Sequence, residues 1–411
     1  MKTLHPRYLR PLLLEALTDT RVVFVAGARQ VGKTTLTREI AAGEHPMTIL
    51  SLDEAATRDA ASRDPGGFLA ELSGPVLIDE VQHVPDLLLE IKRAVDKDTT
   101  PGRFLLTGSA NILTSKKIKD ALTGRIETLN LWPLAQSEVR GGLVNFADAL
   151  FAGTPPQLSG CAMGRNAFAS IVAAGGYPEA LLRTGSRRER WFESYIDSTL
   201  DRDLRDISDA IKIEEMPRLL RLIGTQAANL LSYRNAAGRL SLSAETVKVY
   251  VGILEQLFLV RRLQAWRPGL GAREASTPKV YLADSGLLAA LLGADETRIA
   301  LDDQLTGKIL ENFVAMEILK HLGWSTNRAR LYHYQRDRED VDLILERADG
   351  QIVAIEVKAR TTIGSQDYKW LIKLRERRGS RFAAGVVIHP REQTIPLGDR
   401  LWALPIGALW A

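Results

Sequence analysis

A glycine-rich motif runs from Gly27 to Thr34, and its residue types and spacing are well suited to chemistry. The motif has the pattern G-x-x-x-x-G-K-[ST]. Its glycines would let backbone N–H groups turn toward phosphate oxygens, while Lys33 would reach the β- and γ-phosphates and the Thr34 hydroxyl would bind Mg²⁺. The motif therefore predicts a nucleoside-triphosphate site. The residues assigned to it are Gly27, Ala28, Arg29, Gln30, Val31, Gly32, Lys33, Thr34 and Thr35.

A second motif, Val76-Leu77-Ile78-Asp79-Glu80, follows about 45 residues later. Asp79 stands where an apolar strand would end, and there it can hold Mg²⁺ through water, as the Walker B aspartate does. Glu80 stands where an attacking water would be polarised, so we assign it as general base beside Lys33 in the catalytic set. A strand that simply ends in two solvated carboxylates is the alternative interpretation.

Two further positions complete the predicted nucleotide site. Ser109 follows the apolar run 103–106, and we choose it as the sensor of the γ-phosphate, with Asn111 nearly as good a choice and a strand-ending turn as the alternative. Arg125 comes soon after that strand. It could complete a neighbouring subunit's site as an arginine finger, or it could form a surface ion pair, and both interpretations stay open.

The elements that must position these residues are apolar runs at 21–25, 76–78 and 103–106. Continuous apolar runs are typical of parallel strands buried on both faces. Ligands bind at the carboxyl edge of such sheets, which is where the motif residues would lie. The segment 35–40 contains neither glycine nor proline and is predicted to leave the phosphate loop as a helix.

A second constellation lies near the carboxyl end. Asp342 and Glu356 fall on two predicted strands of a hairpin, Lys358 follows Glu356 on the same face, and Glu311 lies on the apolar stripe of a helix, where a carboxylate needs a partner. Together they resemble the PD-(D/E)-x-K nuclease core, in which Asp342 and Glu356 would hold Mg²⁺ and Lys358 would steady the attacking hydroxide. No proline precedes Asp342, so Asp340 is an alternative ligand. A structural or binding module with a buried Glu–Lys pair is the alternative interpretation.

The order of predicted elements over 214–283 is that of a winged helix. Helices are expected at 215–231, 235–239 and 243–257, followed by strands at 258–266 and 279–283. The third helix would leave Tyr250 outward with its polar neighbours. The alternatives are a wing for protein packing or an ATPase lid. The residues predicted to contact DNA are Thr246, Lys248, Arg267 and Arg273.

Composition sets wider bounds on the protein. The chain has 411 residues, of which 45% are apolar and 25% charged, as in ordinary globular domains. A net charge of +4 with a pI near 9.1 permits nucleic acid as a partner but does not argue for it. The single cysteine excludes an internal disulfide framework and fits a reducing cytoplasm. No apolar run approaches about 18 residues, so no membrane span is expected.

Motifs across nearly the whole chain resemble those of bacterial and archaeal AAA-type ATPases with a poorly characterised C-terminal region. They are GARQVGKTT, LDEA, VLIDEVQ, RFLLTGSAN, LTGRIETLNLWPLAQSE, YIDSTLDRDLRD, KVYLADSGL and IEVKA. The resemblance implies ATP binding and hydrolysis, and AAA-type sites between subunits suggest a homo-oligomer, perhaps a hexameric ring. The predicted α/β architecture comprises a AAA-type P-loop NTPase domain with a parallel sheet (1–145), a helical lid or linker (146–212), a winged-helix-like domain (213–290) and a restriction-endonuclease-like domain (300–411).

Three hypotheses of function follow from these motifs. The first is a DNA-acting ATPase, in which all three kinds of module serve nucleic acid. The second is a nucleotide-dependent regulatory switch that remodels a protein assembly and uses the C-terminal domain as a docking module. The third is an Mg²⁺-dependent nuclease gated by ATP. Stimulation of ATP hydrolysis by DNA distinguishes the first from the second.

Overall fold

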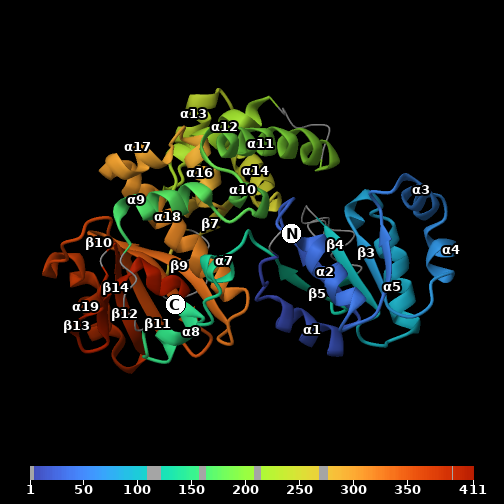
Figure 1. Ribbon diagram of the computed structural model, residues 1–411, viewed down its shortest axis with the longest axis horizontal. Helices are drawn as coiled ribbons and strands as arrows, with labels where there is room; N and C mark the ends of the chain where they lie inside the picture. Colours follow the sequence, from blue (N-terminus) through green and yellow to red (C-terminus); the bar gives the residue numbers. More distant parts are fainter. Residues whose placement is uncertain (1–3, 109–121, 157–162, 208–213, 268–275, 391) are drawn as a thin grey trace. The chain divides into compact units, whose positions relative to one another are not determined.

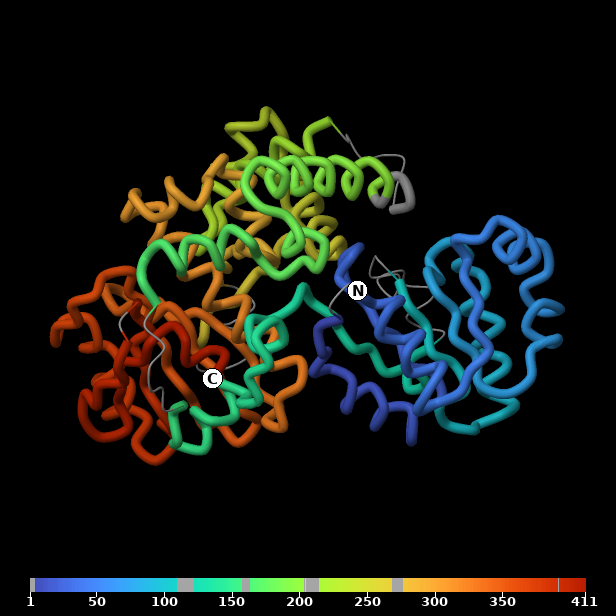
Figure 2. Tube along the Cα trace, viewed as in Figure 1, coloured from blue at the N-terminus to red at the C-terminus, as the bar shows by residue number. Residues whose placement is uncertain are grey.

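The computed structural model describes residues 4–108, 122–156, 163–207, 214–267, 276–390 and 392–411. These residues form two compact units (Figures 1 and 2). The nucleotide unit comprises Arg7–Pro133 with Gln256–Phe258, and the C-terminal unit comprises Leu134–Glu255 and Leu259–Ala411 together with the described residues that precede Arg7. The boundary after Pro133 precedes the predicted one at residue 145. The three domains predicted beyond it fall within one unit, so their separate limits stay predictions.

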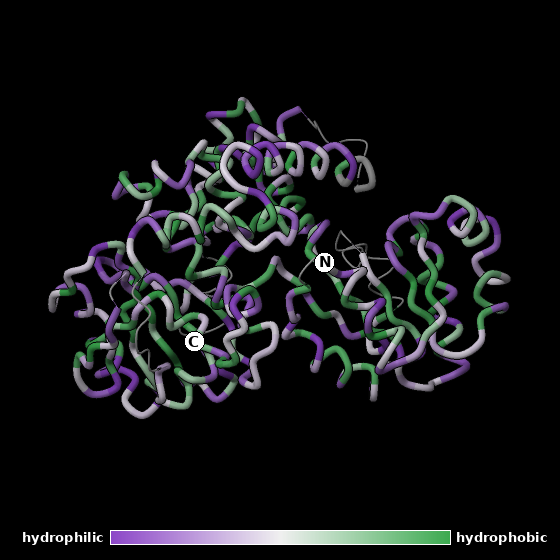
Figure 3. Tube along the Cα trace, in the orientation of Figure 1, coloured by the Kyte–Doolittle hydropathy of each residue, from purple (hydrophilic) through white to green (hydrophobic). Residues whose placement is uncertain are grey.

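The nucleotide unit is built on a five-stranded parallel sheet with the strand order β2-β3-β4-β1-β5. Every residue of β1, β3 and β4 is buried, as their continuous apolar runs predicted, and Figure 3 shows these strands as hydrophobic. Because β4 lies between β1 and β3, it separates the strands that carry the two motifs. The strands are β1 (Val22–Ala26), β2 (Thr48–Ser51), β3 (Val76–Asp79), β4 (Phe104–Gly108) and β5 (Ile126–Asn130).

Helices accompany this sheet, and Figure 1 shows them in blue to cyan around the strands. The helix that leaves the phosphate loop begins at Lys33 and buries Leu36, Ile40 and Ala41 on one side. Each crossover between parallel strands needs such a connection. The helices are α1 (Arg10–Asp19), α2 (Lys33–Ala42), α3 (Ala55–Arg63), α4 (Pro65–Ala70), the 3₁₀ turn η1 (Val81–His83) and α5 (Leu87–Lys97).

The C-terminal unit begins with helices and contains a three-stranded antiparallel sheet with the order β6-β8-β7. Its elements up to residue 256 are α7 (Gln136–Arg140), α8 (Phe146–Phe151), α9 (Arg165–Ala174), α10 (Pro178–Leu181), α11 (Gly185–Ile207), α12 (Glu215–Thr225), β6 (Asn229–Leu230), α13 (Tyr233–Leu240) and α14 (Ala244–Gln256). Then follow β7 (Val260–Leu263), β8 (Lys279–Leu282), α16 (Ser285–Leu291) and α17 (Glu296–Leu301).

Two predictions for this region were wrong. The helix predicted over 215–231 ends at Thr225, because the chain turns to pair with β8: Ala228 has φ 64°, and its N–H donates to Val280 O at 2.8 Å. Tyr250, predicted to face outward, is only 5% exposed and joins the buried face of α14. The rest of that face, which includes Val247, is buried as predicted.

The last part of the C-terminal unit is a six-stranded mixed sheet with the order β13-β14-β12-β11-β10-β9. Strands β9, β10 and β11 are antiparallel neighbours, whereas β11, β12 and β14 run parallel. The elements are α18 (Asp303–Leu322), β9 (Ala329–Arg336), β10 (Glu339–Arg347), β11 (Ile352–Val357), η3 (Ser365–Asp367), α19 (Lys369–Arg378), η4 (Gly379–Arg381), β12 (Phe382–His389), β13 (Ile395–Gly398), β14 (Leu401–Pro405) and η5 (Ile406–Trp410).

Candidate functional site

The phosphate loop connects β1 to α2 and needs glycine at two positions. A Cβ atom on Gly27 would lie 2.3 Å from the carbonyl oxygen of Leu131, a distance at which backbone must shift. Gly32 has φ +98°, in the left-handed region that other residues avoid. The loop therefore depends on both glycines of the motif for its course around the N-terminus of α2, where phosphate oxygens would meet free N–H groups.

Two cations hold the loop in place. Lys33 is only 3% exposed, and its Nζ donates to the carbonyl oxygens of Gly27 at 3.0 Å and Ala28 at 2.9 Å. Arg7 donates through Nη1 to Val31 O and through Nη2 to Trp132 O, both at 2.7 Å. The Lys33 ammonium group thus lies against the backbone of the phosphate loop. Arg7 bridges the loop to the segment after β5, a role that the sequence analysis did not predict.

Arg7→Ala is expected to destabilise the nucleotide unit by about 2 kcal/mol, because one carbonyl of the loop and one of the segment after β5 lose a charged donor. Arg7→Lys should restore little of this loss, since a single ammonium lacks the fork that reaches both oxygens. Chemical unfolding of the full chain measures both variants. Equal stability of parent and Arg7→Ala would show that the bridge contributes nothing.

Three side chains converge at the carboxyl ends of β3 and β4. The Thr34 hydroxyl donates to Asp79 Oδ1 at 3.1 Å, and the Thr107 hydroxyl donates to the same oxygen. Thr107 Oγ1 also accepts from the Glu80 N–H at 3.1 Å. Burial raises the pKa of Asp79, and the Glu80 carboxylate raises it further, against the hydrogen bonds from the two threonines. A cation at this point would offset that cost.

These residues fit a magnesium–triphosphate. A threonine hydroxyl and a Walker B carboxylate are the protein groups that hold Mg²⁺ in P-loop sites, with phosphate oxygens and water as the other ligands. Thr34 and Asp79 already lie within hydrogen-bond distance, and Lys33 stands one residue before Thr34. The geometry thus brings together the predicted ligands, although β3 and α2 come from separate parts of the chain.

Glu80 has an unusual backbone conformation. Its φ is 57°, in the left-handed region, immediately after β3 ends at Asp79. This backbone conformation costs a residue other than glycine of order 1–3 kcal/mol, and such residues are concentrated at functional sites. Gln82 Nε2 donates to Glu80 Oε2 and so holds the carboxylate. The role of Glu80 as general base stays a prediction. Sequence reasoning missed the contact from Gln82, which would position the carboxylate in that role.

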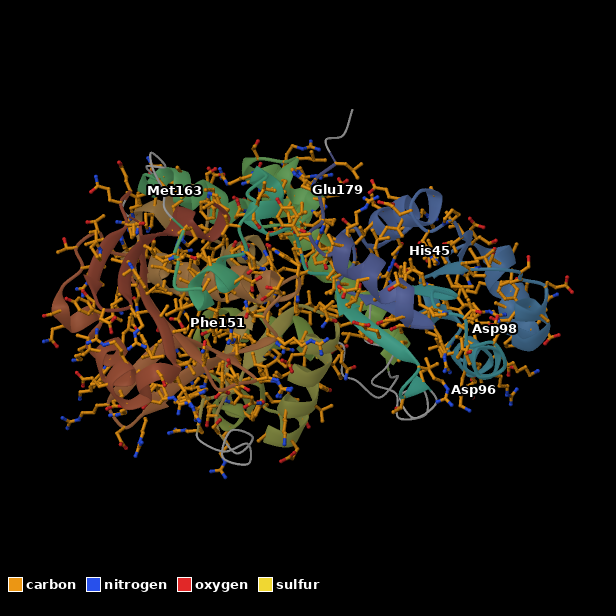
Figure 4. All side chains as sticks on the ribbon, turned by 90° about the horizontal axis from the view of Figure 1, so that it is seen from below. His45, Asp96, Asp98, Phe151, Met163 and Glu179 are labelled. Atoms are coloured by element: carbon orange, nitrogen blue, oxygen red, sulfur yellow. The ribbon has the colours of Figure 1, made fainter. Side chains whose placement is uncertain are left out.

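The two remaining predictions for the nucleotide site have different outcomes. Ser109 and Asn111 lie outside the described residues, and both stay predictions. Arg125 forms an ion pair with Asp96 (labelled in Figure 4), in which Nη2 lies 3.2 Å from Oδ2. This contact matches the surface-pair interpretation of Arg125. A role in a neighbouring subunit stays a prediction.

The structure brings together all four predicted residues of the C-terminal constellation. Strand register places Leu343 opposite Ile355, so Asp342 lies beside Glu356, and Asp342 Oδ2 accepts from Val357 N at 2.8 Å. Lys358 pairs with Glu356. Burial raises the pKa of Glu356 to about 8, and the Asp342 carboxylate adds to the rise.

Glu311 has the partners that its place on an apolar stripe demanded. Glu311 Oε1 accepts from Lys279 Nζ and from the Tyr281 hydroxyl, each at 3.0 Å. Lys279 Nζ also lies 3.6 Å from Asp342 Oδ1. Burial and the Asp342 carboxylate raise the pKa of Glu311 to about 7, and Lys279 opposes that rise. Neither Lys279 nor Tyr281 was predicted as part of this cluster.

The residues at the phosphate loop fit Mg²⁺, whereas this cluster does not fit a metal ion. Within the described residues, no group of three or more acidic, histidine or cysteine side chains is placed to hold a metal. An ammonium group instead lies between the carboxylates of Glu311 and Asp342. The ammonium of Lys279 thus takes the position between these carboxylates that a metal ion would need.

The predicted DNA contacts are only partly described. Lys248 is exposed on α14, and Thr246 is half-buried in its first turn, where its N–H donates to Ser243 Oγ at 2.9 Å. Arg267 is half-buried after β7, and Arg273 lies outside the described residues. A groove of about 540 Å³ lies at the start of α14 and includes Thr246 and Val249. Among the positions that the structure describes, no contact identifies a ligand.

Three parts of the chain match protein-family models. Residues 19–140 match an AAA domain, residues 165–298 match a domain of unknown function (DUF8612), and residues 306–409 match a domain of unknown function (DUF4143). The AAA match contains both nucleotide motifs. Among the helices that the structure describes, none has the length and apolar content that a membrane span requires.

Two curated relatives resemble almost the whole chain. They are uncharacterized proteins of Mycobacterium tuberculosis (strain ATCC 25618 / H37Rv) and Mycobacterium bovis (strain ATCC BAA-935 / AF2122/97), each 30% identical over 396 residues, which are 96% of this chain and 82% of the relative. Two solved structures share 21% sequence identity with this chain. They are the Thermotoga maritima RuvB Holliday junction branch migration motor and a single-substitution variant of it. Each match covers 62% of this chain and 87% of the solved chain, with TM-scores of 0.28 and 0.29.

Proposed function

Because the chain belongs to the same family as the two uncharacterized mycobacterial proteins and contains an AAA domain at residues 19–140, we propose that it hydrolyses ATP with Mg²⁺ and couples hydrolysis to the binding or remodelling of DNA. The AAA domain is a nucleotide-binding ATPase domain. The observation that carries the proposed chemistry is the convergence of Thr34, Asp79 and Thr107 beside Lys33.

Each residue has a defined task in this proposal. Lys33 would exchange its two carbonyl partners for β- and γ-phosphate oxygens, and Thr34 and Asp79 would hold Mg²⁺, which supplies positive charge to the phosphates. Glu80 would accept a proton from a water molecule while the oxygen of that water attacks the γ-phosphorus. The bond from the γ-phosphorus to the bridging oxygen breaks, and ADP and inorganic phosphate leave. Ser109 as γ-phosphate sensor and Arg125 as a finger in a homo-oligomeric ring extend the proposal.

The case for DNA depends on residues 215–282. The order helix, strand, helix, helix, strand, strand with the sheet β6-β8-β7 supports a winged-helix interpretation. In that interpretation α14 is the helix that would enter the major groove. Lys248 is exposed on it, as a phosphate or base contact must be.

We expect one DNA form to stimulate steady-state ATP hydrolysis several-fold when single-stranded, duplex and branched DNA are compared in the presence of Mg²⁺. Lys248→Ala should reduce the stimulation and weaken its salt dependence, because one phosphate contact is lost. Lys97→Ala, at an exposed lysine of α5, is the matched control. Hydrolysis indifferent to every DNA would contradict the DNA role.

A second candidate function is the regulatory switch, in which the C-terminal domain docks to a protein rather than cutting nucleic acid. The observation that favours it is the ammonium of Lys279 between Glu311 and Asp342. Hydrolysis without DNA stimulation, together with nucleotide-dependent change in oligomeric state by light scattering, would support this candidate over the first. Location in the cytoplasm stays a prediction in either case.

A further inference from the structure

Three largely buried carboxylates gather at one point of the C-terminal unit, the exposed Asp340 carboxylate lies near them, and together they come from three elements. Glu311 lies on α18, Asp340 and Asp342 lie on β10, and Glu356 lies on β11. Asp342 and Glu356 are no more than 9% exposed. Buried carboxylates repel one another and lose hydration, so a cluster of this kind needs positive charge within contact distance.

The chain supplies that charge from a distant segment. The side chain of Lys279, on β8, is 8% exposed, and its Nζ lies 3.0 Å from Glu311 Oε1 and 3.6 Å from Asp342 Oδ1. Lys358 takes the other side of the cluster through Glu356. Two ammonium groups therefore contact three carboxylates, and the two carboxylates near Lys279 belong to different elements.

The oxygens that a divalent cation would need are also occupied by donors from the chain. Glu311 Oε1 accepts from the Tyr281 hydroxyl as well as from Lys279, and Asp342 Oδ2 accepts from the Val357 N–H at 2.8 Å. Mg²⁺ demands near-octahedral oxygen ligands at about 2.0–2.1 Å. A metal could enter only if the ammonium left and these hydrogen bonds rearranged.

Strand β8 is fastened to α18 at a further point in register with these contacts. The Asn312 side chain accepts from Leu282 N at 2.8 Å and donates to Leu282 O at 3.0 Å, and it is fully buried. Asn312 follows Glu311 on the helix, and Leu282 follows Tyr281 on the strand. Strand β8 thus contacts α18 through three of its residues, Lys279, Tyr281 and Leu282, so the strand is joined to the helix along its length.

We propose that Lys279 takes the place of a divalent cation in this cluster. The carboxylates then fasten the β6-β8-β7 sheet to α18, β10 and β11 of the same unit instead of holding a catalytic metal. The resemblance to a nuclease core would then persist in residue types, while the task of those residues is to join two parts of the chain. This inference goes beyond the proposed function, because it does not depend on ATP hydrolysis or on DNA.

The first test measures metal binding directly. Free Mn²⁺ is followed by electron paramagnetic resonance as nucleotide-free parent chain and Asp342→Asn are titrated. We expect the two chains to bind the same amount of Mn²⁺, since Asp342 already faces the ammonium of Lys279. Binding by the parent that Asp342→Asn abolishes would overturn the proposal.

The second test measures the link between Lys279 and Glu311. Lys279→Met is expected to lower the thermal unfolding midpoint of the full chain by about 5 °C or more, because it leaves buried carboxylates uncompensated. The matched control is Lys248→Met, at an exposed lysine of α14, which should shift the midpoint little. Because Glu311→Gln removes one of those charges, the double variant should lose less than the sum of the two single losses. Additive losses would overturn the proposal.

Discussion

Glu80→Gln is expected to bind ATP as tightly as the parent chain and to hydrolyse it about 10²–10⁴-fold more slowly, the range that a general base contributes. The amide keeps the shape of the carboxylate but cannot accept the proton of the attacking water. Gln82 can still donate to the side-chain oxygen, so the turn after β3 should keep its conformation. Fluorescent-nucleotide binding and steady-state phosphate release together separate the two effects.

A matched control for this substitution is Glu71→Gln, at an exposed glutamate that ends α4 in the same unit. Glu71→Gln should change neither binding nor turnover. If Glu80→Gln hydrolyses ATP at the parent rate, another group takes the proton and the assignment of Glu80 fails. If Glu80→Gln loses binding instead, the residue supports the loop rather than the chemical step.

Lys33→Ala is expected to abolish measurable ATP binding. The loss of two charged contacts to phosphate oxygens, each of about 1.5–3 kcal/mol, corresponds to roughly 100- to 10⁴-fold in affinity. The side chain is buried against Gly27 and Ala28, and its removal also leaves those carbonyl oxygens without their donor. Isothermal titration with ATP and Mg²⁺ gives the affinity, and circular dichroism confirms that the unit stays folded.

The control for Lys33→Ala is Lys97→Ala, which removes a cation of the same unit from an exposed position on α5. Its affinity for ATP should equal that of the parent. Retained binding in Lys33→Ala, within a few-fold of the parent, would mean that the loop backbone alone holds the triphosphate. The prediction would then be wrong in its central residue.

The residues of the candidate nucleotide site could largely be predicted, because most of them belong to two short, contiguous sequence motifs. Lys33 and Thr34 belong to one motif, and Asp79 ends one strand with Glu80 directly after it, so spacing alone was enough to predict roles for them, and those roles stay predictions. Thr107 is a polar residue near the end of an apolar strand, and no role was predicted for it. Its contact with Asp79 follows from the position of β4 beside β3, which no local pattern reports.

The residues that sequence reasoning missed act across long separations. Arg7 reaches Val31 and Trp132, and Lys279 reaches Glu311 and Asp342. An arginine near the start of a helix and a lysine at the start of a strand look like solvated charges in the sequence. Only the close approach of distant segments turns them into partners of buried oxygens.

The helix predicted over 215–231 failed for a related reason. Its apolar spacing continued past Thr225, but the last residues gain more from hydrogen bonds to β8 than from another helical turn. Tertiary pairing overrode local periodicity there. Within 340–358, by contrast, the alternation and the turn at Gly350 were strong enough to predict both the hairpin and the pairing of Asp342 with Glu356.

The bridge made by Arg7 has a mechanical consequence. It ties the phosphate loop at Val31 to Trp132, and Gly27 lies directly against Leu131, so two peptide groups just before the end of the nucleotide unit rest on the loop. Any displacement of the loop as a triphosphate enters or leaves must strain these contacts or carry the peptides along. We therefore expect nucleotide binding and release to act on the covalent connection after Pro133, which is one of the points at which the chain leaves the unit.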